Sequence, residues 1–400
     1  MANATTSAER IEVLDGLRGL ALFGILLANI LIWSGWVIMT DPQRLSLAGP
    51  EAVSWQYRFH HLLVDGKFYT IFSMLFGAGF ALQIARLAAR GSDGLRIYRR
   101  RVLILLAMGL IHSWLIWDGD ILTLYALLGL LLPTFRNCRE RTLLIVAAIL
   151  IFLVPAVGIG LSSHFGWKPH LAFYDLSFAI GHAMGANTAP DQALAWVSRP
   201  DFMGWFSWTF SGTPYSWGSR VESWRIPKVF GIMLIGMAVG RRLASGTLLD
   251  DRRLLWRIVV IGFAVGLPLS LVYAAVPGLD QTDWPSLFGT VPLALGYAAG
   301  FVLLWRSAQP ALRHLVPVGR MALTNYLMHS IIGTLLFFGI GFGLVGKLQP
   351  VSIYAVAIAI FSAQIVFSRW WLSRHDQGPM EHLWRSLTYA GRVDPRVAVA

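Results

Sequence analysis

The sequence predicts an all-α polytopic membrane protein, a single bundle of about ten transmembrane helices with both termini in the cytoplasm. Three observations predict it. The 400-residue chain is 56% hydrophobic and only 14% charged, less charge than a soluble domain needs to cover its surface. Runs of roughly 18 or more residues with few or no charges recur along it, and such runs can cross a hydrocarbon core of about 30 Å. The arginines gather in alternate segments between these runs.

The uncharged runs give the predicted spans in chain order. The first is too long for a signal-peptide core, so we expect it to be retained as a helix. The short turn Asp118-Gly119-Asp120 makes the third and fourth spans antiparallel neighbours. The runs cover residues 19–39, 68–85, 102–117, 121–135, 142–163, 229–240, 258–279, 284–305, 321–346 and 348–368.

The net charge of +12 is distributed by side rather than in one basic patch, which argues against a nucleic-acid partner. The only charged residues of the loop 277–283 are Asp280 and Asp283, whereas other segments between the spans are rich in arginine. Arginine-rich segments lie in the cytoplasm in polytopic proteins, so an even number of spans in a bacterial inner membrane is expected. The arginine-rich segments are Arg86 to Arg101, Arg136 to Arg141, Arg241 to Arg257, Arg306 to Arg320, and Arg369 to Arg396.

Residues 1–372 are expected to form the bundle, with an outer Trp-rich region at 162–227. This region is interpreted as loop and short amphipathic helices that either anchor at the headgroup layer or cover the mouth of the bundle. Residues 373–400 form a basic amphipathic cytoplasmic tail that anionic lipids would attract. Cys138 is the only cysteine, so no intramolecular disulfide can form.

Ionisable and strongly polar groups within the spans are costly in a membrane, so each is a functional hypothesis with a structural rival. Asp15 and Arg18 can pair on one face at the inner end of the first span, as an anchor or as part of a binding site. Asn29 lies about 16 Å further along the helix axis. An interhelical hydrogen bond is the structural alternative for its amide.

His112, Asp118 and Asp120 meet at one membrane depth, with Tyr125 about one turn further on. An imidazole oriented by a carboxylate is the arrangement that general-base catalysis needs. The structural alternatives are that Asp120 caps the following helix and that His112 is a buried hydrogen-bonding residue.

Two further sets of polar residues are candidates for a functional site. His60 and His61 precede Asp65 and Lys67 on the outer side, where they can act as a base or stand solvated in a loop. On the ninth span Asn325 and His329 are four residues apart and share a face, next to Thr324, Tyr326 and Ser330. That face either lines a cavity or packs against another helix. No His, Cys and carboxylate set has metal-ligand spacing, so no metal site is expected.

Five segments in order resemble the YeiB-like family of bacterial membrane proteins, which carries a domain of unknown function numbered 418. They cover nearly the whole chain. The segments are residues 14–29 (LDGLRGLALFGILLAN), 66–77 (GKFYTIFSMLFG), 112–125, 319–326 (GRMALTNY) and 378–385 (GPMEHLWR).

That family is in turn distantly similar to transmembrane acyltransferases, including heparan-alpha-glucosaminide N-acetyltransferase. The pattern Asp15, Arg18, Asn29 matches the corresponding helix of that enzyme, in which the Asn lies beside a catalytic His. The spacing after Asn29 differs here, and His60, His61 or His112 would take the part of the base.

The resemblance implies transfer of an acyl group from a cytoplasmic acyl-CoA donor to an extracytoplasmic hydroxyl or amine. His112 would be the base with Asp120, and Asn29 would stabilise the oxyanion. Membrane lipids are expected partners, and the sequence leaves undecided whether the protein forms a homodimer. The residues implied in binding donor or acceptor are Asp15, Arg18, Lys67, Tyr125, Arg320, Asn325 and His329.

Two other functions remain open from the sequence. In a small-molecule transporter the same polar residues would line a pathway, although no internal repeat is evident. In a non-catalytic membrane scaffold they would all serve packing.

Overall fold

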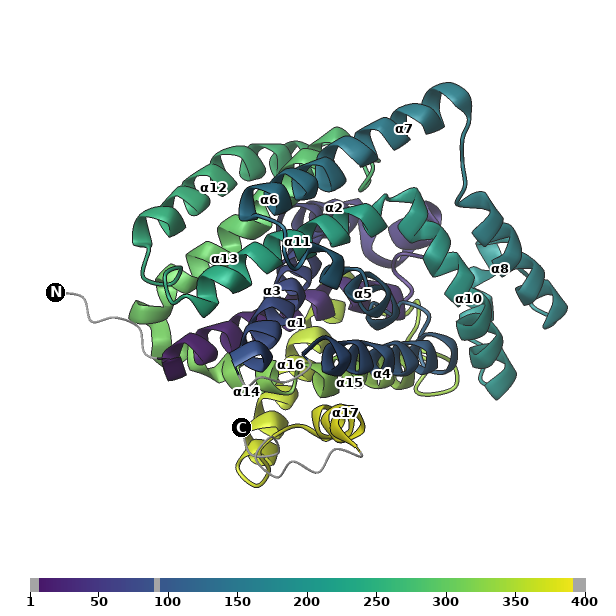
Figure 1. Cartoon of the computed structure of the whole chain (residues 1–400). Helices are drawn as coiled ribbons and strands as arrows, with labels where there is room; N and C mark the ends of the chain where they lie inside the picture. Colours follow the sequence, from purple (N-terminus) through teal and green to yellow (C-terminus); the bar gives the residue numbers. More distant parts are fainter. Residues whose placement is uncertain (1–6, 90–93, 391–400) are drawn as a thin grey trace.

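The computed structural model describes residues 7–89 and 94–390, and every regular element in these ranges is a helix (Figure 1). Arg90 and the last ten residues of the predicted tail lie outside the described residues. The helices are α1 (Ser7–Trp33), α2 (Asp41–Phe59), α3 (Lys67–Ala89), α4 (Gly94–Leu115), α5 (Leu122–Gly129), α6 (Glu140–Ala148), α7 (Val154–Phe165), α8 (Leu171–Ala183), α9 (Ala193–Val197), α10 (Phe202–Glu222), α11 (Arg225–Ala244), α12 (Arg252–Ala275), α13 (Trp284–Leu312), α14 (Val316–Arg320), α15 (Ala322–Phe337), α16 (Pro350–Leu372) and α17 (Pro379–Tyr389).

The predicted all-helical membrane fold is confirmed. Six helical stretches in the described ranges are long and apolar enough to cross a membrane, and α15 is a shorter apolar helix. The count of about ten spans and the cytoplasmic side of the termini stay predictions. The six stretches are Glu12–Trp33, Asp41–Leu87, Glu140–Phe165, Arg252–Ala275, Trp284–Arg320 and Pro350–Leu372.

Several helices end before their apolar runs do, and the runs 321–346 and 121–135 are the clearest cases. The run 321–346 forms helix only to Phe337, because the backbone of Phe338 is extended and a glycine-rich turn follows. In the run 121–135, α5 has only 8 residues and gives way to a 3-10 turn that begins at Leu132 and contains Pro133. Apolarity therefore marked where these segments lie, but glycine and proline set where the helices end.

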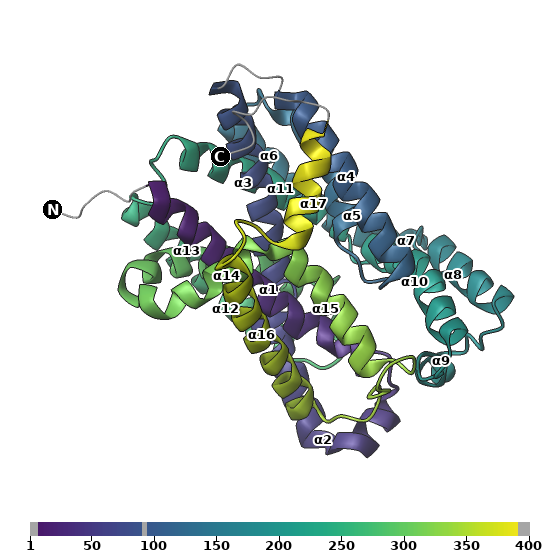
Figure 2. The same ribbon diagram turned by 90° about the horizontal axis from the view of Figure 1, so that it is seen from below.

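Helix α2 was not predicted, because its sequence is too polar to read as a span. It begins with a capping box in which Thr40 and Gln43 satisfy each other's backbone N–H groups. Its Trp55 is exposed, whereas its Gln56 is buried and accepts a hydrogen bond from the Trp36 indole N–H at 2.7 Å. Figure 2 places α2 at the end of the bundle where α16 begins.

Helix α1 forms the centre of the bundle, where it contacts α3, α13, α14, α15 and α16 (Figure 2). Its side chains Leu22, Leu26 and Ile30 are completely buried. Beside it the backbones of α3 and α11 are in contact. A Cβ added at Gly77 of α3 would overlap the Met233 carbonyl group of α11. Small residues at such crossings let membrane helices pack closely.

The Trp-rich region 162–227 contains α10, whose 21 residues make it longer than the short helices expected there. Asp201 begins it by accepting a hydrogen bond from the Gly204 N–H at 2.7 Å. Helices α8 and α10 lie side by side at the edge of the bundle (Figure 1). Ser177 joins them by donating to the Ser211 carbonyl oxygen at 2.7 Å.

Helix α17, in the predicted tail, packs against α4 and α15 (Figure 2). The Trp384 indole N–H donates to the Arg101 carbonyl oxygen at 2.8 Å, and the Arg101 guanidinium lies 4.1 Å from the centre of the Trp384 ring. Glu381 accepts hydrogen bonds from the backbone N–H groups of Leu323 and Thr324, at 2.7 and 3.1 Å. The tail helix thus holds the first turn of α15.

Candidate functional site

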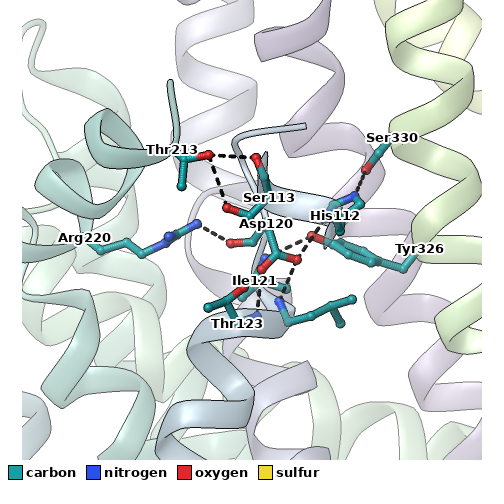
Figure 3. A network of polar contacts seen from close by, with 10 residues as sticks. His112, Ser113, Asp120, Ile121, Thr123, Thr213, Arg220, Tyr326 and Ser330 are labelled. Carbon is teal, nitrogen blue, oxygen red and sulfur yellow. Dashed lines mark hydrogen bonds and ion pairs between the residues drawn. The ribbon is translucent and has the colours of Figure 1, made fainter. Parts of the chain in front are cut away.

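His112 and Asp120 form a buried hydrogen-bonded pair at the hairpin between α4 and α5 (Figure 3). His112 Nδ1 lies 2.9 Å from Asp120 Oδ1. Each residue is only 1% exposed. The short turn that joins the two helices brings the imidazole and the carboxylate together, as their spacing in the sequence predicted.

The Asp120 carboxylate is held in place by the start of α5. It accepts hydrogen bonds from the backbone N–H groups of Leu122 at 3.0 Å and Thr123 at 2.7 Å. Because the carboxylate oxygens are acceptors, the His112 Nδ1–H donates to Asp120, and in the neutral imidazole Nε2 is then the acceptor. Asp120 therefore binds the helix start and orients the imidazole at the same time.

His112 Nε2 faces Ser330 on α15, 2.9 Å from its Oγ. Ser330 is completely buried. Asp120, His112 and Ser330 thus form one hydrogen-bonded row from three different elements (Figure 3). The sequence placed Ser330 on a polar helix face, but no local motif linked it to a histidine 218 residues earlier.

Neighbouring side chains fix the hairpin from both sides (Figure 3). On one side the Tyr326 hydroxyl oxygen accepts from the Ile121 N–H at 3.1 Å. On the other side Arg220 of α10 donates to the Asp120 carbonyl oxygen. Thr213, also on α10, donates to the Ser113 carbonyl oxygen at 2.7 Å. The network therefore joins α4, α5, α10 and α15.

Several buried polar atoms near this row have no hydrogen-bond partner among the described residues. They include the indole nitrogens of Trp33 and Trp117 and the hydroxyl oxygen of Thr334. The two indole rings pack together with their centres 4.6 Å apart. The Trp117 ring also lies 6.3 Å from the His112 ring. Buried donors without acceptors are rare and costly in folded proteins.

The structure places Tyr125 and Asn29 near this level but outside the row. The Tyr125 hydroxyl lies 2.7 Å from Ser73 Oγ and donates to the Tyr69 carbonyl oxygen at 3.3 Å. Asn29 is half-buried on α1, one turn before Trp33. Neither side chain is hydrogen-bonded to His112 in the described ranges.

Lys67 belongs to a second polar cluster, at the start of α3. Its ammonium group is buried and donates to the His61 carbonyl oxygen at 2.5 Å. Asp65 in the same cluster accepts from Tyr273 at 2.7 Å and from Gln281 at 2.6 Å. These contacts tie the α2–α3 segment to α12 and the loop after it, and none of them reaches His112.

Asn325 and His329 face α16. The Asn325 amide donates to Ser368 Oγ at 3.0 Å, and His329 Nε2 lies 2.7 Å from Gln364 Oε1. Both residues are completely buried, although Asn325 Oδ1 and His329 Nδ1 have no partner in the described part of the chain. The polar face predicted on the ninth span is therefore divided, with Ser330 toward α4 and these two residues toward α16.

Asp15, Arg18 and Arg320 lie at the other end of α1. Arg18 donates to the Asp15 carboxylate, and Arg320 donates to the Asp376 carbonyl oxygen at 3.0 Å. Arg18 precedes Trp33 by fifteen residues of continuous helix, or about 22 Å along the axis. In the described residues no group of three or more His, Cys, Asp and Glu side chains can hold a metal ion.

Comparison with known proteins gives the family. A family model described as "Protein of unknown function (DUF418)" matches residues 239–391. The chain is also 32% identical to the uncharacterized protein YxaH of Bacillus subtilis (strain 168), over 96% of each chain. The chain belongs to the YeiB-like DUF418 family.

Two more relatives support this membership. The uncharacterized protein YeiB of Escherichia coli (strain K12) is 31% identical over 95% of this chain and 96% of its own. An uncharacterized 39.9 kDa protein from the amylase 3' region of Bacillus acidopullulyticus is 30% identical, over 95% and 94%. No solved structure matches the chain. The segment matched by the DUF418 model contains Ser330 but neither His112 nor Asp120, so the row joins this segment to the preceding half of the protein.

Proposed function

We propose that this protein is an acyltransferase of the bacterial inner membrane. It moves an acyl group from a cytoplasmic acyl-CoA-type donor to a hydroxyl or amine acceptor on the opposite side. The observation that supports it most is the buried pair of His112 and Asp120, in which the carboxylate fixes the imidazole and leaves Nε2 ready to take a proton.

The surroundings of this pair suit acyl transfer. Attack on a thioester carbonyl places negative charge on its oxygen, and hydrogen-bond donors in a dry site stabilise that charge strongly. The indole N–H groups of Trp33 and Trp117 are buried there without acceptors among the described residues. The Asn29 amide on the same helix as Trp33 is a further donor for this oxygen.

The donor would enter from the arginine-rich end. Arg18 is partly exposed there and Arg320 is exposed, and both supply guanidinium groups that match phosphate oxygens. The axial distance of about 22 Å between Arg18 and Trp33 must then be crossed by the long pantetheine arm of the donor. The similarity of the first helix to that of transmembrane acyltransferases supports the same orientation.

Thioester consumption by the purified protein tests this function. In lipid nanodiscs the protein should bind acetyl-CoA and release free thiol slowly without an acceptor. The variant His112→Gln should lower this rate at least about 100-fold. His164→Gln is the matched control, because His164 is exposed on α7 and outside the network.

Two results would contradict the proposal. One is a folded protein that neither binds nor hydrolyses any acyl-CoA tested. The other is ligand-dependent flux in proteoliposomes that His112→Gln leaves unchanged, which would favour a small-molecule permease.

A further inference from the structure

We infer that Ser330 is a nucleophile that carries the acyl group as a covalent ester between donor and acceptor. This inference rests on the proposed acyl transfer and adds a step to it. The observation behind it is the row Asp120, His112, Ser330, with 2.9 Å from carboxylate to imidazole and 2.9 Å from imidazole to hydroxyl.

The roles in this row match those of a nucleophile, base and orienting acid. Asp120 binds the Nδ1 side of the ring, and Ser330 Oγ can donate its proton to Nε2 (Figure 3). The same three roles recur on unrelated folds and are recognised by geometry rather than by position in the sequence. An ordinary serine hydroxyl is a weak nucleophile, and a base at this distance activates it.

Ser330 also occupies the position that an acceptor would need for direct attack. A single displacement requires the acceptor hydroxyl to sit on Nε2, yet in this structure the side chain of Ser330 is already there. A covalent intermediate avoids that conflict. It also lets a donor and an acceptor from opposite sides of the membrane use one buried site in turn, without meeting in it.

The two half-reactions balance. In the first, Ser330 Oγ attacks the thioester carbonyl carbon, the O–C bond forms, the C–S bond breaks, and His112 passes the serine proton to the departing thiolate. In the second, the acceptor hydroxyl or amine attacks the ester carbon and the Ser330 O–C bond breaks. His112 takes the acceptor proton and returns it to Oγ.

Independent support comes from donors left without partners. Trp33 packs against α15 at Gly333, where an added Cβ would overlap its ring. Thr334 stands one turn after Ser330, and its hydroxyl oxygen also has no partner in the part of the chain that the structure describes. A carbonyl oxygen bound beside Ser330 would satisfy such buried donors as the Trp33 and Trp117 indoles, whose desolvation is otherwise uncompensated.

Acyl labelling tests the intermediate. The nanodisc protein is incubated with [14C]acetyl-CoA without acceptor, denatured and digested, and the labelled peptide is sequenced by mass spectrometry. We expect label on Ser330, no label in Ser330→Ala, and thioester consumption reduced at least about 10³-fold in that variant. Ser330→Cys should be labelled as a thioester that neutral hydroxylamine removes. Ser270→Ala is the control, because Ser270 is equally buried, on α12, but outside the network.

The outcomes separate this inference from the proposed function. Transfer that persists in Ser330→Ala, without label on the wild-type serine, would overturn the nucleophile and leave acyl transfer with a single displacement. If the wild type consumes no acyl-CoA, labelling of Ser330 by a fluorophosphonate probe is the second measurement. Labelling of Ser330 that depends on His112 would support the nucleophile with another acyl donor, whereas a folded protein that the probe does not label would overturn it.

Discussion

The carboxylate of Glu381 binds Thr324 through both of its oxygens. Oε2 accepts from the Thr324 hydroxyl at 2.6 Å, and Oε1 accepts from the Thr324 N–H at 3.1 Å. The first N–H groups of a helix have no acceptor within it. Glu381 supplies these acceptors from α17, in place of a capping residue next to the start of α15. The tail helix and the helix that carries Ser330 are therefore held together by hydrogen bonds.

Replacing Glu381 with alanine should destabilise the protein by about 1–2 kcal/mol, because the first turn of α15 loses its acceptors. Glu381→Gln should cost less, since its amide oxygen still accepts. The measurement is thermal unfolding in detergent. Glu51→Ala is the control, because Glu51 is exposed on α2. Equal melting temperatures for Glu381→Ala and the control would contradict the capping role.

Asp120→Asn should separate the two tasks of Asp120. The amide oxygen can still accept from the Thr123 N–H, but the amide nitrogen that replaces the other oxygen cannot accept from the Leu122 N–H, so we expect a small fall in melting temperature. The charge that orients His112 is lost, so acyl transfer should fall by about 10²–10⁴-fold. Asp191→Asn, at an exposed site, serves as the control. Unchanged thioester consumption in Asp120→Asn would exclude the carboxylate from the reaction.

Gly77→Ala and Gly79→Ala form a matched pair on α3. A Cβ at Gly77 would overlap the Met233 carbonyl group on α11, whereas a Cβ at Gly79 meets no atom of the described residues within 4 Å. We expect Gly77→Ala to destabilise the protein by about 1–3 kcal/mol through overpacking. Gly79→Ala should be neutral or slightly stabilising, because alanine favours helix. Similar unfolding curves for both variants would contradict the close contact between Gly77 of α3 and Met233 of α11.

Asp201 should make the start of α10 sensitive to acid. The Gly204 N–H that donates to it lowers the pKa of its carboxyl group, and a hydrogen bond from Arg199 acts in the same direction. A lowered folded-state pKa contributes stability above the unfolded pKa of about 3.9, and this is lost as pH falls through the folded value. When the pH is lowered below about 4, the melting temperature of Asp201→Asn should therefore fall less than that of the wild type. Parallel pH profiles would refute the cap.

Cys138 is a native probe of orientation, because it is the only cysteine and is partly exposed. A membrane-impermeant maleimide should label it only after spheroplasts are permeabilised, if the arginine-rich loops are cytoplasmic. Pro277→Cys in a Cys138→Ser background should be labelled from outside, since residue 277 is exposed in the acidic loop. Labelling of Cys138 in intact spheroplasts would reverse the predicted topology.

The sequence predicted the helices well where apolarity decides the outcome. Long uncharged runs such as 284–305 coincide with helices because lipid leaves the backbone no other way to satisfy its hydrogen bonds. Prediction failed where local chemistry decides, as at the end of α15, where glycines follow Phe337. Helix α2 was missed because its polar surface carries no hydropathy signal.

The candidate site was predictable only as far as neighbouring residues make it. His112 and Asp120 are eight residues apart, and the short turn between them forces a meeting. Ser330, Trp33 and Arg220 reach the hairpin through packing of distant helices, and a single sequence does not record such contacts. Nothing in the sequence singles out Trp33 or Trp117 either, because tryptophan is common in membrane proteins.

The burial of the row has a consequence for the energetics of the cell. His112 and Asp120 are each 1% exposed, and Ser330 is fully enclosed. Under the proposed acyl transfer, an acyl unit handed on at this depth would cross with little accompanying water. A covalent relay through such a dry site would move one acyl unit and no ions, whereas a wide aqueous passage collapses the proton-motive force. The proposed relay would therefore let a membrane that stores its energy as an ion gradient export an activated group without discharging itself.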